Sequence, residues 1–373
     1  MTSTVNADNG AVSGVSGLKH YSDNSGLLAL QTNGVDAVQV NAAQQVNFPN
    51  AINAPNTFGF KNRIINGAMM IDQRNAGASV TPADGNYLVD RWFYNGSVGG
   101  KFTAQQNAGS VTPPPGFAKY LGFTSTSAYS IGTNDYFMGR QLIEGLNTVD
   151  LAWGTASATS VTLSFWVRSS LTGTFGGIIE NAASNMCYTF AYTINSANTW
   201  EYKTIAVPGP TSGAWATDNS MGIGIWFALG IGSGRTASPG SWGATRGFAP
   251  TGQVNVAGTN GATFYITGVQ FEKGSQATAF DFRSYQQELA LCQRYFEQTS
   301  GAFYNNGNAS YMLGINFAVD KRASPTITRL SSFWSGAEAA PTVNAGYPAT
   351  RNFFISGSTT TFLGGNFSAS AEL

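Results

Sequence analysis

Charged side chains are scarce in this sequence. Only 10% of the 373 residues are charged, against about 25% in an ordinary globular domain. The 19 Lys and Arg residues balance the 19 Asp and Glu residues, so the formal net charge is zero. Without a basic field, recognition of nucleic acid or anionic lipid by bulk charge is excluded. A weakly charged surface instead favours burial in an oligomer, so we expect self-association.

Histidine and cysteine are nearly absent as well. The single histidine, His20, lies in a polar N-terminal stretch, so the rest of the chain cannot supply a Ser-His-Asp or Cys-His catalytic set. Cys187 and Cys292 lie far apart and outside any CxxC motif. Two such cysteines cannot make a zinc site alone. We expect buried free thiols, and the alternative is a disulfide between them. The glycine-rich run Gly222–Arg235 has no helical pattern after it and therefore does not indicate a phosphate-binding loop.

Long apolar runs are missing too. The most apolar stretch, Met221–Gly232, is shorter than the roughly 20 residues that a membrane-spanning helix needs. The N-terminus, MTSTVNADNG, has neither the basic region nor the apolar region of a secretory signal. We therefore expect a soluble protein that is made in a cytoplasm and does not insert into a membrane.

What the sequence does contain is typical of strands and turns. There are 45 glycines, and aromatic residues make up 13% of the chain; aromatic and β-branched residues favour pleated faces and glycine favours turns. Runs with strand character recur between Gly-, Pro- and Ser-rich segments, without helical patterns between them. The clearest are Val161–Ser170, Cys187–Ile194, Trp200–Val207, Met221–Leu229 and Ala262–Glu272. This spacing predicts an all-β fold with a β-sandwich over residues 61–281.

Two smaller β segments flank the sandwich. In residues 1–60, the short alternating runs around Leu30 and Val38 are joined by Asn33-Gly34, which is a strong hairpin signal. Each strand has one thin apolar face, so the hairpin needs partners, and three copies around one axis would supply them. Residues 299–373 return to strand-like runs and predict a small C-terminal β domain.

A single amphipathic helix is predicted over residues 282–298. Ser284 stands at the N-cap position and Gln287 follows at capping-box spacing. An apolar stripe follows at helical spacing over roughly four turns. Its members are Tyr285, Leu289, Cys292 and Phe296. The stripe packs either on the chain's own sandwich or, in a trimer, against its copies at a threefold axis.

Several stretches resemble bacteriophage tail fibre and tail spike proteins. The resemblance lies in NRIINGAMMIDQRNAG (Asn62–Gly77) with YLVDRWFYNG (Tyr87–Gly96), and in the stretch from Phe264 to Phe296; its specific part is Asp90-Arg91-Trp92 and the block from Glu272 to Phe296. LSFWVRSSLTGTF (Leu163–Phe175) is similar to carbohydrate-binding jelly rolls, and Leu28–Phe48 is similar to the β-repeats of fibre shafts.

The resemblance implies a homotrimeric receptor-binding protein of the virion tail, made in the host cytoplasm. Residues 1–60 would form the shaft and bind tail or baseplate proteins, and residues 61–281 would form the jelly roll. Residues 282–298 would be the connecting helix and 299–373 the distal tip. The partner would be a host surface polysaccharide. No cofactor is implied, although jelly rolls of this type often hold a structural calcium ion.

Sugar binding calls for aromatic faces and hydrogen-bonding side chains on loops. Tryptophans within strand-like runs are assigned to the core: Trp92, Trp166, Trp200 and Trp226. The candidate glycan contacts lie in polar loops or in the C-terminal domain. They are Trp215, Trp242, the arginines Arg235 and Arg246 that flank Trp242 in the sequence, Trp334 and Tyr347. For the two loop tryptophans the alternative is a plug on the sandwich, and for Trp334 and Tyr347 it is a small trimeric core.

Catalysis is not expected. Glycosidase chemistry needs two carboxyl groups about 5–10 Å apart, and no carboxylate pair is recognisable in the sequence. Asp90 is interpreted as part of a structural ion pair and Glu272 as a local cap. The expected function is adhesion to a host surface glycan. The alternatives are a purely structural tail component and a short polysaccharide depolymerase.

Overall fold

A computed structural model describes residues 28–32, 35–40, 46–47, 60–304, 311–334, 342–345, 349–357 and 362–373. The chain divides into two compact units, Met1–Pro55 and Asn56–Leu373. In the first unit, β1 (Leu28–Thr32), β2 (Val35–Val40) and β3 (Val46–Asn47) form one antiparallel sheet. Thr32 pairs with Val35, as the predicted hairpin requires, although the two turn residues lie outside the described ranges. The assignment of this unit to a fibre shaft remains a prediction.

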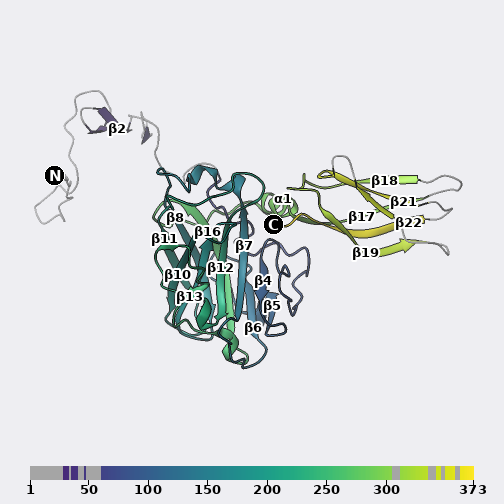
Figure 1. Cartoon of the computed structure of the whole chain (residues 1–373). Coiled ribbons are helices and arrows are strands. Elements are labelled where there is room, and N and C mark those ends of the chain that lie inside the picture. Colours follow the sequence, from purple (N-terminus) through teal and green to yellow (C-terminus); the bar gives the residue numbers. More distant parts are fainter. Residues whose placement is uncertain are drawn as a thin grey trace, which may run out of the picture. The chain divides into compact units, whose positions relative to one another are not determined.

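The second unit contains a β-sandwich, which confirms the predicted fold class (Figure 1). Its six-stranded sheet has the order β14 (Trp242–Gly243), β10 (Cys187–Ile194), β9 (Gly173–Glu180), β12 (Met221–Ile231), β7 (Tyr136–Glu144) and β4 (Phe93–Gly96). Its five-stranded sheet has the order β11 (Glu201–Val207), β8 (Val161–Ser169), β16 (Thr263–Lys273), β6 (Leu121–Ser125) and β5 (Phe102–Gln106). A parallel pair joins β13 (Thr236–Ala237) to β15 (Ala249–Pro250). Short 3-10 turns cover Ala108–Ser110, Gly145–Asn147, Val149–Leu151, Ser233–Arg235 and Val256–Gly258.

The core between the two sheets follows from strand alternation. Along β8, Val161, Leu163, Phe165 and Val167 are fully buried in the main core cluster. Because successive side chains of a strand point to opposite faces, Trp166 lies on the outer face. Trp92 is buried in the core, as expected from the sequence.

One α-helix, α1 (Tyr285–Gln293), occurs in the described ranges. It begins with the predicted capping box, since Ser284 accepts a hydrogen bond from the Gln287 backbone and Gln287 bonds back to the N-cap. The expectation of four helical turns was wrong. The helix has nine residues, and Phe296 belongs to the next strand. None of the described helices has the length and apolar character needed to cross a bilayer.

The predicted stripe of the helix divides between two environments. Cys292 is fully buried against Ile65, Ile71 and Tyr295 of the same chain, with Leu289 partly buried beside them. Tyr285, in contrast, is 55% exposed. The helix therefore packs on its own chain through Cys292, and its contact with other copies remains a prediction.

The C-terminal β segment consists of two three-stranded antiparallel sheets, in agreement with the predicted strand content. One sheet contains β17 (Phe296–Tyr304), β22 (Phe362–Ser370) and β19 (Thr326–Trp334). The other contains β18 (Tyr311–Asn316), β21 (Asn352–Gly357) and β20 (Thr342–Ala345). After β22 the chain ends beside α1 (Figure 1), where Ala371 donates a backbone hydrogen bond to Tyr295.

Candidate functional site: an aromatic groove

An aromatic groove lies on the outer face of the five-stranded sheet; we define it as Phe117, Trp166, Tyr202, Phe280 and Phe282. Trp166 of β8 stands directly opposite Tyr202 of β11 in the strand register, and their rings lie 5.4 Å apart. Tyr202 is 43% exposed. The assignment of Trp166 to the core was wrong, because the alternation of β8 turns it outward.

Three phenylalanines form the other side of the groove. The ring centroids of Phe117 lie 5.1 Å from Phe280 and 5.3 Å from Phe282, and Phe280 and Phe282 are 4.8 Å apart. Phe282 is 61% exposed, more than any other large apolar side chain in the described residues. The three phenylalanines are not among the glycan contacts predicted from the sequence, because the loop before β6 and the segment after β16 meet only in the folded chain.

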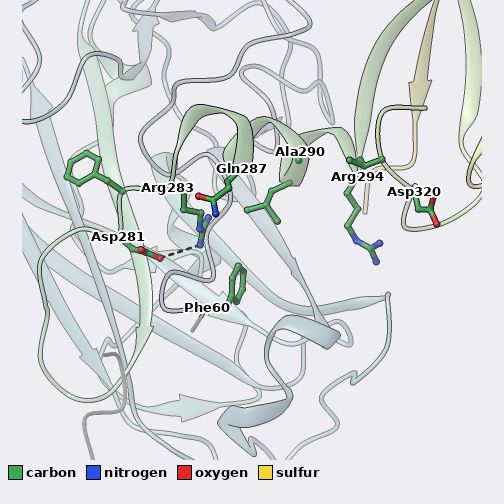
Figure 2. Close-up of a pocket in the computed structure, with 10 residues that line it drawn as sticks. Phe60, Asp281, Arg283, Gln287, Ala290, Arg294 and Asp320 are labelled. Carbon is green, nitrogen blue, oxygen red and sulfur yellow. Dashed lines mark ion pairs between the residues drawn. The ribbon is translucent and has the colours of Figure 1, made fainter. Parts of the chain in front are cut away.

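Three cavities adjoin this groove. The first, of about 580 Å³, lies between the phenylalanines and the Trp166–Tyr202 pair. The second, of about 230 Å³, lies on the α1 side of the phenylalanines and includes Tyr285. The third, of about 700 Å³, runs along α1 (Figure 2). Phe282 lines all three, so one exposed ring forms a shared wall.

The charged groups around the third cavity are engaged within the chain. Asp281 and Arg283 form an ion pair at 3.8 Å (Figure 2). Arg294 binds the buried carboxylate of Glu144 at 3.0 Å, and Asp320 accepts a hydrogen bond of 2.9 Å from Arg351 of the C-terminal segment. The two aspartates and two arginines that line this cavity therefore balance in charge, and each has an ion-pair partner within the chain.

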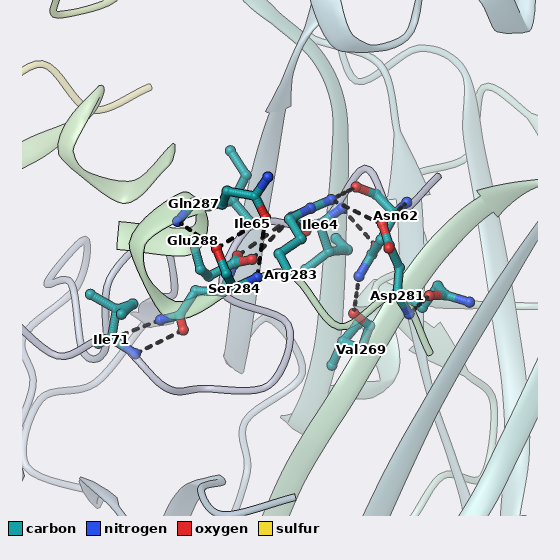
Figure 3. Close-up of polar contacts among 12 residues, drawn as sticks. Asn62, Ile64, Ile65, Ile71, Val269, Asp281, Arg283, Ser284, Gln287 and Glu288 are labelled. Atoms are coloured by element: carbon teal, nitrogen blue, oxygen red, sulfur yellow. Dashed lines mark hydrogen bonds and ion pairs between the residues drawn. The ribbon is translucent and has the colours of Figure 1, made fainter. Parts of the chain in front are cut away.

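A polar hub holds this region in place (Figure 3). Asn62 is 1% exposed; its Oδ1 accepts hydrogen bonds from the backbone of Ile64 and Phe271, and its Nδ2 donates to the Val269 carbonyl. Arg283 donates to the carbonyls of Asn62 and Ile64. Two of the stretches that resemble tail proteins, Asn62–Gly77 and Phe264–Phe296, are thus bonded to each other.

A second asparagine, Asn66, anchors the start of the same motif. It has a left-handed φ of 58° and is fully buried. Its side chain bonds both backbone groups of Ile71 and the carbonyl of Asp90, and its own carbonyl accepts from the Trp92 indole at 3.1 Å. Its backbone N–H donates to Glu288 of α1. Asn62 and Asn66 therefore stabilise the fold.

The two candidate loop tryptophans lie elsewhere, in an aromatic cluster with Trp153. The Trp153 centroid lies 4.8 Å from Trp215 and 5.4 Å from Trp242, and Trp215 and Trp242 are 5.6 Å apart, all with edge-to-face geometry. All three indole N–H groups donate to backbone carbonyls of the chain. A cavity of about 170 Å³ adjoins Trp153 and Trp215. This geometry favours the plug interpretation.

The two candidate arginines do not lie around Trp242. Arg246 makes two hydrogen bonds of 2.7 Å to Glu180, which is 1% exposed, and these bonds raise the pKa of Arg246. Its guanidinium lies 4.8 Å from the Phe248 ring. Arg235 donates to the carbonyl of Asn134, and its guanidinium lies 5.7 Å from the same Phe248 ring. Both arginines already have partners in the chain.

The remaining candidates lie in the C-terminal segment. Trp334 is the last residue of β19. Tyr347 lies outside the described residues.

The core assignment of Trp200 also needs correction. Trp200 lies on the outer face of the five-stranded sheet, with its ring 5.4 Å from Tyr120 and its N–H bonded to the carbonyl of Thr112. Trp226 is buried in a hydrophobic core cluster, as expected from the sequence, and this cluster lies on the outer face of the six-stranded sheet.

The carboxylates interpreted as structural do have structural partners. Asp90 lies 3.6 Å from Arg74 and accepts hydrogen bonds from Gln73, while its burial raises its pKa. Glu272 accepts hydrogen bonds from the backbone and hydroxyl of Thr278. In the described part of the chain, no group of three or more His, Cys, Asp or Glu residues could hold a metal ion. We therefore name no ligands for a calcium ion.

No family model and no curated protein sequence matches the chain. Among solved structures, the enzymatically active domain of tailspike protein 4 of bacteriophage CBA120 is similar over 57% of this chain and 21% of its own, at 13% identity and a TM-score of 0.33. TmCBM61 in complex with β-1,4-galactotriose is similar over 58% of this chain and 100% of its own, at 9% identity and a TM-score of 0.29. A family 11 carbohydrate-binding module of a Clostridium thermocellum cellulase covers 54% and 98%, at 14% identity and 0.26. This chain spans about a fifth of the tailspike structure, and at these TM-scores none of the likenesses carries an argument about function.

Proposed function

We propose that the chain is a phage tail fibre or receptor-binding protein that attaches to a bacterial surface glycan without cleaving it. The observation that carries this proposal is Phe282, which is 61% exposed and shared by three adjoining cavities. An aromatic ring in this position costs solvation free energy unless a ligand or partner covers it.

The chemistry of the groove suits a sugar. Aromatic faces can stack on the apolar C–H faces of pyranose rings, and the groove places Trp166, Tyr202 and Phe282 around one cavity of about 580 Å³. That volume falls in the range of small-ligand pockets. Asp281 and Arg283, on the neighbouring cavity, supply polar groups for hydroxyls. Two of the groove's aromatics lie on strands of a packed sheet, so the platform is already rigid before binding.

The wider proposal concerns assembly. It places the protein in the virion tail as a homotrimer, with the first unit bound to tail or baseplate proteins. It is supported by the resemblance of Asn62–Gly77 and Tyr87–Gly96 to tail proteins. Three copies per fibre would turn weak sugar contacts into firm attachment through effective concentration. Light scattering on the full chain tests this: we expect about three times 39.3 kDa, and a monomer would contradict the fibre architecture.

A glycan array tests the binding proposal. Wild-type protein is compared with Trp166→Ala and Phe282→Ala, and Leu146→Ala is the control because Leu146 is a similarly exposed apolar side chain outside the groove, at 54%. We expect binding to at least one bacterial surface glycan, lost in both groove variants and kept in the control. Silence across surface glycans would favour a structural tail component, and release of reducing sugar from a bound polysaccharide would establish a depolymerase.

A further inference from the structure

An arginine is held between two aromatic rings on the outer face of the six-stranded sheet. Arg140 lies in the middle of β7, opposite Phe93 of β4 on one side and Trp226 of β12 on the other. Its guanidinium carbon lies 4.0 Å from the Phe93 ring centroid and 3.8 Å from that of Trp226. Rings on both sides fix the orientation of the planar group and leave its edge, where the N–H donors lie, for other partners.

No acceptor in the described part of the chain uses that edge. The Arg140 side chain forms no ion pair with and donates no hydrogen bond to any described residue, and its Nε is buried without a partner. Two nearby arginines that also lie over aromatic rings differ: Arg246, 5.4 Å from the Trp226 ring, is bound to Glu180, and Arg74, 4.6 Å from the Tyr87 ring, is bound to Glu372.

The carboxylates that act on the charge of Arg140, Glu180 and Asp84, accept hydrogen bonds from other residues. Glu180 accepts both hydrogen bonds from Arg246. Asp84 accepts from the Asn95 side chain at 2.7 Å and from the Gly96 backbone at 3.0 Å. Burial lowers the pKa of Arg140 to about 10, and the nearby carboxylates of Glu180 and Asp84 offset only part of this shift. The group stays cationic at neutral pH and has no directly bound counter-ion among the described residues.

A second unpartnered donor lies beside it. Trp226 is 4% exposed, and its indole Nε1 is buried with no hydrogen-bond acceptor among the described residues. That nitrogen stands over Gly224, where even a methyl group would come within 3.0 Å of it. Buried donors without acceptors are uncommon in folded proteins and call for an explanation. A ligand oxygen near Arg140 and Trp226 would supply one.

We propose that Arg140 is the centre of a second binding site, which takes an oxyanion group, either a carboxylate or a phosphate. The choice of an acidic surface glycan as its natural source rests on the proposed function. A guanidinium with a free edge matches both anions, because two parallel N–H groups can donate to two oxygens. The site lies on the opposite sheet from the aromatic groove, so an acidic glycan could be bound there independently of a neutral one.

Calorimetric titration of the full-length protein tests this site with three probes. Trigalacturonate supplies a carboxylate, glycerol 3-phosphate supplies a phosphate, and galactotriose is the uncharged comparison. We expect wild-type protein to bind one of the two anions, and Arg140→Gln to weaken that binding about tenfold to a hundredfold, the range of a charge-assisted hydrogen bond. Arg168→Gln is the matched control, because Arg168 is an outward arginine 5.5 Å from the Tyr265 ring on the other sheet.

The outcomes separate the two proposals. The site is overturned if wild-type protein binds neither anion at millimolar concentration, or if Arg140→Gln binds as well as wild type. Arg140→Lys is the second variant where the glutamine variant does not fold; it keeps the charge but loses the planar fork, and we expect it to bind at least about tenfold more weakly. Trp166→Ala is expected to leave anion binding unchanged, so failure of the aromatic groove would not remove this site.

Discussion

Replacing Asn62 by alanine should destabilise the fold strongly, although Asn62 contributes little apolar surface. Its side chain makes three hydrogen bonds of 2.9–3.1 Å to main-chain groups of Ile64, Val269 and Phe271, all in a buried setting. Alanine leaves two backbone N–H groups and one carbonyl without their partners. A buried polar group that loses its partner costs about 1–3 kcal/mol. We therefore expect the free energy of unfolding to fall by at least about 3 kcal/mol.

Urea unfolding, followed by tryptophan fluorescence and by circular dichroism, measures this loss. Protein concentrations must be matched, because association changes apparent stability. Asn366→Ala is the control: Asn366 is exposed and donates a 2.8 Å hydrogen bond to Ser331, so its removal should change stability by less than about 0.5 kcal/mol. A loss below about 1 kcal/mol for Asn62→Ala would refute the structural role of this motif and reopen it as a binding surface.

Three further perturbations follow from the same geometry. Glu372→Gln removes the partner of Arg91, whose side chain is 1% exposed, and breaking a buried ion pair should cost about 3–5 kcal/mol in thermal unfolding; an unchanged melting temperature would contradict the pairing. Burial raises the pKa of Cys187 to about 11 and raises that of Cys292 well above its ordinary value, so the thiolate, which forms only as pH rises toward the pKa, is scarce at pH 8. Neither thiol should react with Ellman's reagent at pH 8 until denaturant is added, and prompt reaction of the folded protein would show that they are accessible. Trp242→Ala should lower stability by about 2 kcal/mol or more while leaving glycan affinity unchanged, because this ring packs on Trp153 and Tyr188.

Much of the sandwich could be predicted from the sequence, because period-two alternation is a local signal. The observed β10 has the predicted bounds, and β8, β12 and β16 differ from them by one or two residues. The strand β9 (Gly173–Glu180) was not predicted, since Gly176 and Gly177 weaken its strand signal. The fold nevertheless requires glycine there: a Cβ at Gly177 would lie 1.8 Å from the Trp226 carbonyl. Such close approaches between strands cannot be deduced from local patterns.

The helix shows the same limit. Its start was predicted because the capping box is formed within four residues, from Ser284 to Gln287. Its end was not, because Phe296 continues the helical spacing while the chain enters β17. Tertiary packing of Cys292 and Tyr295 on Ile65 overrides the pattern there.

The candidate site likewise has one part that could be predicted from the sequence and one part that could not. The outward direction of Trp166 follows from the alternation of Leu163, Phe165 and Val167, and could have been read from the sequence. The groove itself could not, because Phe117 and Phe282 come together only through long-range contacts.

The central claim is that the aromatic groove binds the glycan. The most direct test is the dissociation constant for the glycan selected on the array, measured by calorimetry for wild type, Trp166→Ala and Trp242→Ala. Loss of a ring at the centre of an interface typically costs more than about 1–2 kcal/mol. We therefore expect Trp166→Ala to bind about tenfold more weakly or worse, and Trp242→Ala to bind like wild type. Unchanged binding in Trp166→Ala, with binding lost in a folded Trp242→Ala, would contradict the account and move the site to the tryptophan cluster.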